Sequence, residues 1–185
     1  MSKIQVDTID TRSGTSTLTL GSTNASTIAL GSGDVQSNFL YPAFLAYLNS
    51  NQTISNDTVT KVTMDTELFD SSGTYDHSTN YRWTPAVAGK YYIFNTVHLS
   101  AQAAANLRNV TVYVYKNGSE EVRHNLNPAS NYGDSFSVTA QTIVDSDDND
   151  YFEAYAYMYS DNNEILQGGK NYTRFGGYRI GTWAQ

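Results

Sequence analysis

From residue 39 to residue 185 the chain consists of short segments in which apolar and polar residues alternate, separated by turn signals. A period of two is the pattern of a half-buried β-strand, and no long helical pattern interrupts the series. Residues 41–48 could form a short helix, but the alternation of Phe44, Ala46 and Leu48 favours a strand. Regularly spaced strands without helices between them predict an all-β sandwich or barrel. Further strands are predicted at 59–64, 90–100, 109–116, 135–144, 151–160 and 177–183.

Two turn signals constrain how these strands are connected. In residues 69–94, turn-rich sequence leads to Trp83, and Gly89 then precedes an alternating aromatic strand. Because glycine adopts backbone angles that other residues avoid, we expect the chain to turn a corner at Gly89. Asn117-Gly118, which follows the alternating valines of 110–114, predicts a tight β-hairpin.

The first 38 residues differ from the rest in composition. They contain no aromatic residue, are rich in Ser, Thr and Gly, and repeat a short alternating unit at 16–22 and again at 26–32. A single chain could not bury the apolar faces of two such units, whereas three chains wound together could. We therefore predict two parts, an oligomeric β-repeat stem at 1–38 and a head at 39–185. A flexible low-complexity linker is the alternative for the first part.

Charge and composition disfavour several classes of function. The net charge of −7 argues against binding to nucleic acid or to an anionic membrane. The chain has no cysteine and begins without a secretion-signal pattern, and none of its segments approaches transmembrane length, so we expect it to fold in the cytoplasm. We find no catalytic motif, and the three histidines are scattered, so no catalytic residue is assigned and an enzyme is not expected.

Several segments of the head resemble complement C1q-like globular domains, a branch of the tumour-necrosis-factor-like jelly rolls. The resemblance rests on 44–47, 61–70, Trp83, 89–94 and 175–178. It implies a jelly-roll β-sandwich that assembles as a trimer and recognises surfaces. Trp83 in place of the usual Phe, Ile93 at a position that is often aromatic, and a short loop at 69–75 look like the microbial and phage branch of the family.

One predicted strand is apolar on both faces. In residues 151–159, Phe and small apolar residues alternate with tyrosines, and Tyr113 and Tyr115 extend the pattern on a second strand. A strand with one solvated face should carry polar residues there, so large aromatic residues indicate burial against another subunit or an exposed binding patch. A tyrosine-rich but solvated sheet is the alternative. The predicted trimer interface, which we call the tyrosine face, comprises Tyr113, Tyr115, Tyr155, Tyr157 and Tyr159.

An acidic cluster at 145–150 has some metal-like character. Asp145, Asp147 and Asp150 could contribute carboxylates to a calcium ion near the trimer apex, which the family resemblance implies. The cluster lacks the glycine and the distal glutamate of an EF-hand, so an acidic hairpin tip without an ion is the alternative. No other cofactor is expected.

Together these features predict a non-enzymatic bacteriophage virion protein, folded in the host cytoplasm and then assembled into the particle. It would be a homotrimeric short fibre or decoration protein whose head attaches to a host-surface glycan or protein. The stem would dock on other virion proteins of the capsid or tail through Ile4, Val6 and Ile9, which alternate well enough to add a strand to a partner's sheet. The alternatives are a capsid-stabilising decoration protein without a receptor and a C1q-like lectin. Neither nucleic-acid binding nor membrane insertion is expected.

Removal of the stem tests this division of labour. A chain that starts at Phe39 should remain a soluble, folded trimer, because the tyrosine face lies within the head. It should fail to bind undecorated or fibreless particles that the full-length protein decorates, since each buried anchor side chain contributes about 1.5–3 kcal/mol. Particle co-sedimentation measures this, and equal binding by both proteins would place the anchor in the head.

Overall fold

The structure is a computed structural model that describes residues 42–101, 107–128, 133–160 and 164–181. These residues all lie in the second of two compact units of the chain, Asn38–Gln185. The predicted stem and its anchoring residues Ile4, Val6 and Ile9 lie outside the described residues, and they remain a prediction.

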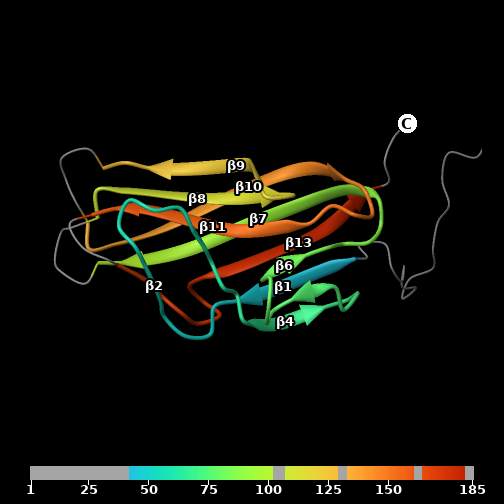
Figure 1. Cartoon of the computed structure of the whole chain (residues 1–185), viewed down its shortest axis with the longest axis horizontal. Coiled ribbons are helices and arrows are strands. Elements are labelled where there is room, and N and C mark those ends of the chain that lie inside the picture. The colour runs from blue at the N-terminus through green and yellow to red at the C-terminus, as the bar shows by residue number, and fades with distance from the viewer. Residues whose placement is uncertain (1–41, 102–106, 129–132, 161–163, 182–185) are drawn as a thin grey trace, which may run out of the picture. The chain divides into compact units, whose positions relative to one another are not determined.

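The described head is all-β, as predicted, and its strands form two antiparallel sheets (Figure 1). The strands are β1 Ala43–Tyr47, β2 Gln52–Ile54, β3 Thr60–Lys61, β4 Thr66–Asp70, β5 Tyr75–Asp76, β6 Arg82–Trp83, β7 Gly89–Ser100, β8 Asn109–Lys116, β9 Ser119–Leu126, β10 Ser135–Ser146, β11 Phe152–Tyr159, β12 Glu164–Leu166 and β13 Arg174–Gly181.

The long strand β7 organises the first sheet, which we call sheet A. It pairs along its whole length with β10 on one side, and with β13 and β12 on the other. β1 and β4 continue the sheet beyond β13, and β2 continues it beyond β12. In the second sheet, sheet B, β11 pairs with β8 on one side and with β3 and β6 on the other. β9 pairs with β8, and β5 with β6, at the two ends of sheet B.

The core lies between the sheets and follows the predicted alternation. Every second residue of β7 is buried, and in β11 the buried apolar residues are Phe152, Ala154, Ala156 and Met158. Trp83 is fully buried at the centre, where its ring centroid lies 4.5 Å from that of Phe44, 5.5 Å from Tyr91 and 6.4 Å from Phe152.

A buried amide also ties the sheets together. Asn95 of β7 is fully buried, and its Nδ2 donates to the backbone oxygens of Tyr113 in β8 (2.8 Å) and Tyr155 in β11 (3.1 Å). Because a buried donor without a partner is costly, these two bonds fix β7 against a defined position of sheet B.

The predicted hairpin at Asn117-Gly118 is confirmed. Both residues have positive φ angles, 53° and 76°, as a two-residue hairpin turn of this type requires, and they join β8 to β9.

Some boundaries differ from those predicted. The strand expected at 59–64 is reduced to the two residues of β3, although Val62 and Met64 are buried. The expected loop at 69–75 overlaps the end of β4, and the closing strand begins at Arg174 rather than at Gly177.

The structure assigns a different role to Gly89. It does not have a positive φ angle, and an added Cβ would lie 2.6 Å from Nε of Arg179 and 2.7 Å from the backbone oxygen of Gly181. Close approach of β13 therefore requires glycine here, rather than the backbone freedom invoked from the sequence.

Gly177 of β13 should be sensitive to substitution. A Cβ there would lie 2.6 Å from Cδ1 of Ile93, 3.0 Å from the backbone oxygen of Tyr92 and 3.3 Å from the Trp83 ring. Gly177→Ala should lower the free energy of unfolding by about 1–3 kcal/mol, the usual cost of overpacking a core. Gly181→Ala on the same strand is the matched control, because an added Cβ there has no atom within 4 Å. Chemical denaturation measures both, and equal losses would contradict the packing role of Gly177.

Candidate functional site

The structure brings the five tyrosines predicted as an interface onto the outward face of sheet B. Tyr155 of β11 lies directly opposite Tyr113 of β8. Tyr115 stacks on Tyr155 with ring centroids 4.3 Å apart, and Nζ of Lys61 lies 5.7 Å from the Tyr155 centroid. Tyr113 is only 7% exposed, whereas Tyr159 is 42% exposed. The tyrosines are therefore partly covered by one another, and Lys61 lies against Tyr155. Their role as a subunit interface stays a prediction.

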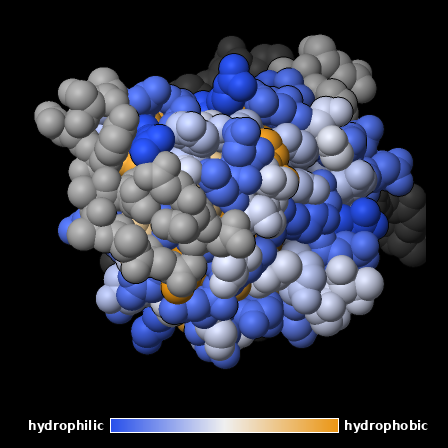
Figure 2. Space-filling model, turned by 60° about the vertical axis from the view of Figure 1, so that its left-hand side comes forward, coloured by the Kyte–Doolittle hydropathy of each residue, from blue (hydrophilic) through white to orange (hydrophobic). Residues whose placement is uncertain are grey.

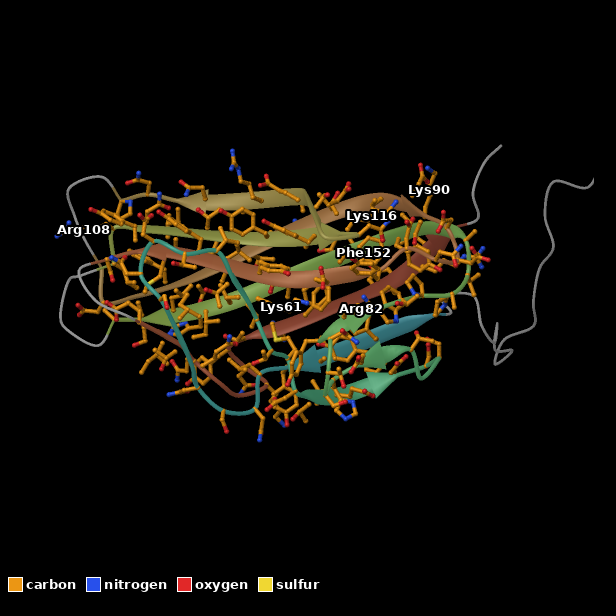
Figure 3. The ribbon with its side chains drawn as sticks, in the orientation of Figure 1. Lys61, Arg82, Lys90, Arg108, Lys116 and Phe152 are labelled. Carbon is orange, nitrogen blue, oxygen red and sulfur yellow. The ribbon has the colours of Figure 1, made fainter. Side chains whose placement is uncertain are left out.

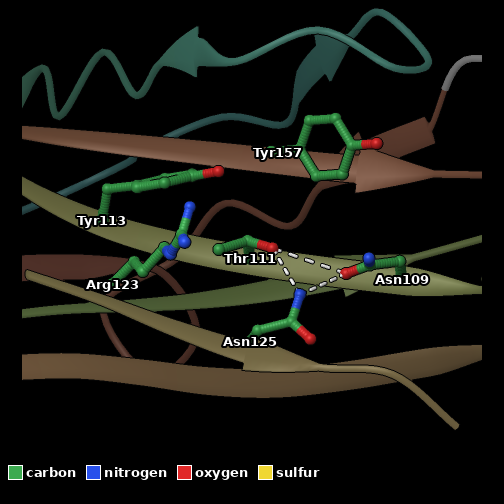
Figure 4. Close-up of a pocket in the computed structure, with 6 residues that line it drawn as sticks. All are labelled: Asn109, Thr111, Tyr113, Arg123, Asn125 and Tyr157. Carbon is green, nitrogen blue, oxygen red and sulfur yellow. Dashed lines mark hydrogen bonds between the residues drawn. The ribbon is translucent and has the colours of Figure 1, made fainter. Parts of the chain in front are cut away.

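A pocket of about 460 Å³ opens in this face between β8, β9 and β11 (Figure 4). Thr111 and Tyr113 of β8 lie opposite Asn125 and Arg123 of β9, respectively. Tyr157 of β11 lies opposite Thr111 on the other side of β8. The lining residues are Asn109, Thr111, Tyr113, Arg123, Asn125 and Tyr157.

Hydrogen bonds hold the polar residues of the pocket in place. Nδ2 of Asn125 donates to Oδ1 of Asn109 (2.5 Å) and to Oγ1 of Thr111 (2.6 Å). The Thr111 hydroxyl in turn donates to Oδ1 of Asn109 (3.4 Å). Two strands thus supply one connected group of polar side chains.

A second hydrogen bond positions the aromatic wall. The Tyr157 hydroxyl donates to Oδ1 of Asp57 (2.7 Å). This hydrogen bond, together with partial burial and the charge of Asp57, raises the pKa of Tyr157 to about 12. Tyr157 is therefore a neutral hydrogen-bond donor at physiological pH.

The outward face of sheet A has a different character. One row of paired residues crosses β4, β1, β13 and β7, and it consists of Phe69, Leu45, Gly176 and Phe94. The neighbouring row places Tyr178 beside Tyr92, with ring centroids 5.4 Å apart, and Ile143 follows on β10 with 64% of its surface exposed. These side chains form an apolar patch, which comprises Leu45, Phe69, Tyr92, Phe94, Ile143 and Tyr178.

Gly176 leaves room for two side chains of this patch. A Cβ there would lie 2.8 Å from the Phe94 ring and 3.0 Å from Cδ1 of Leu45.

On the face of the head that Figure 2 shows, hydrophilic residues predominate and hydrophobic ones appear only as scattered spots. Contiguous exposed apolar area on a folded domain marks an interaction surface.

The acidic cluster is paired with lysines. Asp145 lies 2.6 Å from Nζ of Lys90, and Asp150 lies 2.8 Å from Nζ of Lys116. Figure 3 shows these lysines at one end of the head, opposite Arg108. Asp147 accepts hydrogen bonds from the backbone N–H groups of Asn149 and Asp150.

Calcium binding at Asp145, Asp147 and Asp150 remains a prediction. Within the described residues, no group of three or more acidic or histidine side chains is arranged to hold a metal ion. No helix among these residues is long and apolar enough to cross a membrane.

The pocket includes four residues that the sequence reasoning did not single out, namely Asn109, Thr111, Arg123 and Asn125. The Asn117-Gly118 hairpin was the available signal, since it places a second strand next to β8. It could not identify the residues that face the pocket, because a β-bulge shifts the pairing between Val114 and Tyr115.

No protein-family model and no curated protein matches this chain. Solved structures do resemble the head. The globular domain of zebrafish complement 1qA protein matches with a TM-score of 0.52 and 15% identity over 77% of this chain and 99% of that chain. Eiger TNF from S. frugiperda matches with a TM-score of 0.53 and 9% identity over 79% of this chain and 96% of that chain. The head is a C1q/TNF-like jelly roll. Identities this low show a shared fold and transfer no residue roles.

The stability of this jelly roll should depend on pH through Asp150. Burial raises the pKa of Asp150, but hydrogen bonds from Lys116, Asn117 and the backbone N–H of Asp147, with the Lys116 charge, bring the pKa below its usual range. Because the folded-state pKa is depressed, this stabilisation is present above the unfolded pKa of about 3.9 and is lost as the pH falls through the folded value.

Asp150→Asn should therefore cost about 1.5–3 kcal/mol at neutral pH, the range for hydrogen bonds to charged groups. The difference from the unmodified protein should shrink as the pH is lowered below 4, about where unfolded Asp becomes protonated. Urea denaturation at a series of pH values measures this. The exposed neighbour Asp148→Asn serves as the control, and a difference independent of pH would contradict the assignment.

Proposed function

We propose that the protein is a homotrimeric, non-enzymatic bacteriophage virion protein, a short fibre or decoration protein. Residues 1–38 attach it to other virion proteins, and the C1q/TNF-like head binds a glycan or protein on the host surface. The protein folds in the host cytoplasm and functions in the virion, with no nucleic-acid partner and no membrane insertion.

The main support for trimer assembly is the apolar patch on sheet A. It spans five strands from β4 to β10, and Ile143 and Phe69 are more than half exposed in the single chain. A surface of this kind is stabilised when a second copy covers it, since burial of apolar area is favourable. In this arrangement the apolar patch forms the contact between subunits, and the tyrosine face is the alternative contact predicted from the sequence.

The pocket on sheet B favours a recognising head over a decoration protein that only stabilises the capsid. A capsid-stabilising decoration protein needs surfaces that fit its neighbours in the capsid. A concave site that contains a few convergent polar groups is, by contrast, the usual form of a ligand site. Assignment to a virion rests on the sequence, namely the aromatic-free repeat of residues 1–38 and the lack of cysteine in a multi-stranded head.

Light scattering coupled to size exclusion tests the assembly. The full-length protein should have a mass of three times 20.4 kDa. Ile143→Asp should dissociate it into monomers, because a carboxylate forced into a dry interface without a partner costs about 3–5 kcal/mol. Tyr159→Asp, an exposed residue on the opposite sheet, is the matched control and should remain trimeric.

The reverse pattern would assign the interface to the tyrosine face. A monodisperse monomer from the unmodified protein at micromolar concentration would overturn the trimer itself. Circular dichroism of both variants checks that the jelly roll stays folded.

A further inference from the structure

The pocket on sheet B contains polar side chains that hydrogen bonds hold in position. Some of their polar atoms make no hydrogen bond within the described residues. Both hydrogens of the Asn125 amide are donated to Asn109 and Thr111, which holds Oδ1 of Asn125 in one orientation. Among the described residues, neither Oδ1 of Asn125 nor Nδ2 of Asn109 has a hydrogen-bond partner. One acceptor and one donor of this bonded group are therefore held in fixed orientations, and in Figure 4 they point away from each other on opposite sides of the group.

Aromatic side chains complete the wall of the pocket, and both are held in place. Tyr157 is fixed by its bond to Asp57 (2.7 Å), and Tyr113 packs edge-to-face on Tyr115 with centroids 5.9 Å apart. Rings that are already immobilised lose little conformational freedom when a ligand packs on them. Aromatic rings next to separate, fixed donors and acceptors suit a ligand that has an apolar face and a rim of hydroxyl groups, because each hydroxyl both donates and accepts.

Charge decides between a neutral and an anionic ligand of this kind. Arg123 is the cation of the pocket, and Nε of Arg123 lies 3.5 Å from Oε1 of Glu120. Asp57 adds a second carboxylate behind Tyr157, and the chain as a whole carries a net charge of −7. A guanidinium already close to the Glu120 carboxylate, in a chain of negative net charge, does not make the site attractive to an anion, so Arg123 serves as a directional donor.

We propose that this pocket binds a neutral sugar unit, such as a terminal hexose or N-acetylhexosamine of a surface glycan. This inference rests on the proposed function, in which the head recognises the host surface. A volume of about 460 Å³ lies within the range of small-molecule sites. Asn109, Asn125 and Arg123 bind the hydroxyls, and Tyr113 and Tyr157 contact the apolar face of the sugar ring.

Titration of the full-length protein with methyl glycosides of glucose, galactose, mannose and N-acetylglucosamine, read by saturation-transfer NMR, tests this site. At least one glycoside should bind saturably, with an affinity that does not change between low and high salt. Asn125→Ala and the exposed Arg123→Gln should each weaken binding at least tenfold. His124→Ala is the matched control, because His124 is the intervening residue of β9 and lies opposite the buried Val112. It should bind like the unmodified protein.

Three results would overturn the proposal. Absence of binding by every glycoside would contradict the sugar site. The trimer assembly would still be tested independently by the mass from light scattering. Tighter binding of glucuronate than of the glucose derivative, with an affinity that falls as salt is added, would show that the ligand is anionic. Equal loss of binding in His124→Ala and Asn125→Ala would also place the ligand elsewhere.

Discussion

The separation of the two sheets depends on the packing of Trp83 over Gly177. The indole lies fully buried between Phe44 and Phe152, and its ring would be 3.3 Å from a Cβ at position 177. Since glycine leaves room there, β13 can approach the ring closely, and the core is filled without displacing β13 from β7. Asn95 adds a directional tie, because its amide reaches backbone oxygens of both β8 and β11. Apolar packing thus sets the spacing of the sheets, and a buried amide sets their relative position.

Once the sheets are held in this way, their outward faces can serve different purposes. Sheet A presents the apolar patch, in which Gly176 leaves space for Phe94 and Leu45. Sheet B presents tyrosines that are partly covered by one another and by Lys61, with a polar pocket beside them. The first face leaves apolar side chains in water, which is costly, whereas the second carries hydroxyl, amide and guanidinium groups that water or a ligand can hydrogen-bond. A trimer contact through sheet A and ligand recognition through sheet B are therefore compatible within one head.

The proposed roles place different demands on these surfaces. A subunit contact needs contiguous apolar area and tolerates few charges, which the apolar patch satisfies. A glycan site needs a modest, preorganised set of donors and acceptors, which the bonded group of Asn109, Thr111 and Asn125 satisfies. The acidic cluster meets neither demand, because Asp145 and Asp150 are already paired with Lys90 and Lys116.

The sequence by itself determined the fold class, most of the long strands and the β8–β9 hairpin. Period-two alternation specifies which side of each strand is buried, and Asn117-Gly118 permits the positive φ angles of the tight turn. Tertiary structure alone decided which residues line the pocket. Continuous pairing from the hairpin turn would place Val122 opposite Tyr113, on the outward face.

A bulge of one residue at Glu121 instead places Val122 opposite the buried Val114, and Arg123 opposite Tyr113. Val122 packs against the core in this register, and its burial favours the bulge. Because a shift of one residue exchanges the two faces of a strand, this bulge turns Arg123 and Asn125 toward the pocket. Local sequence cannot specify that choice, since it depends on contacts with strands far away in the chain.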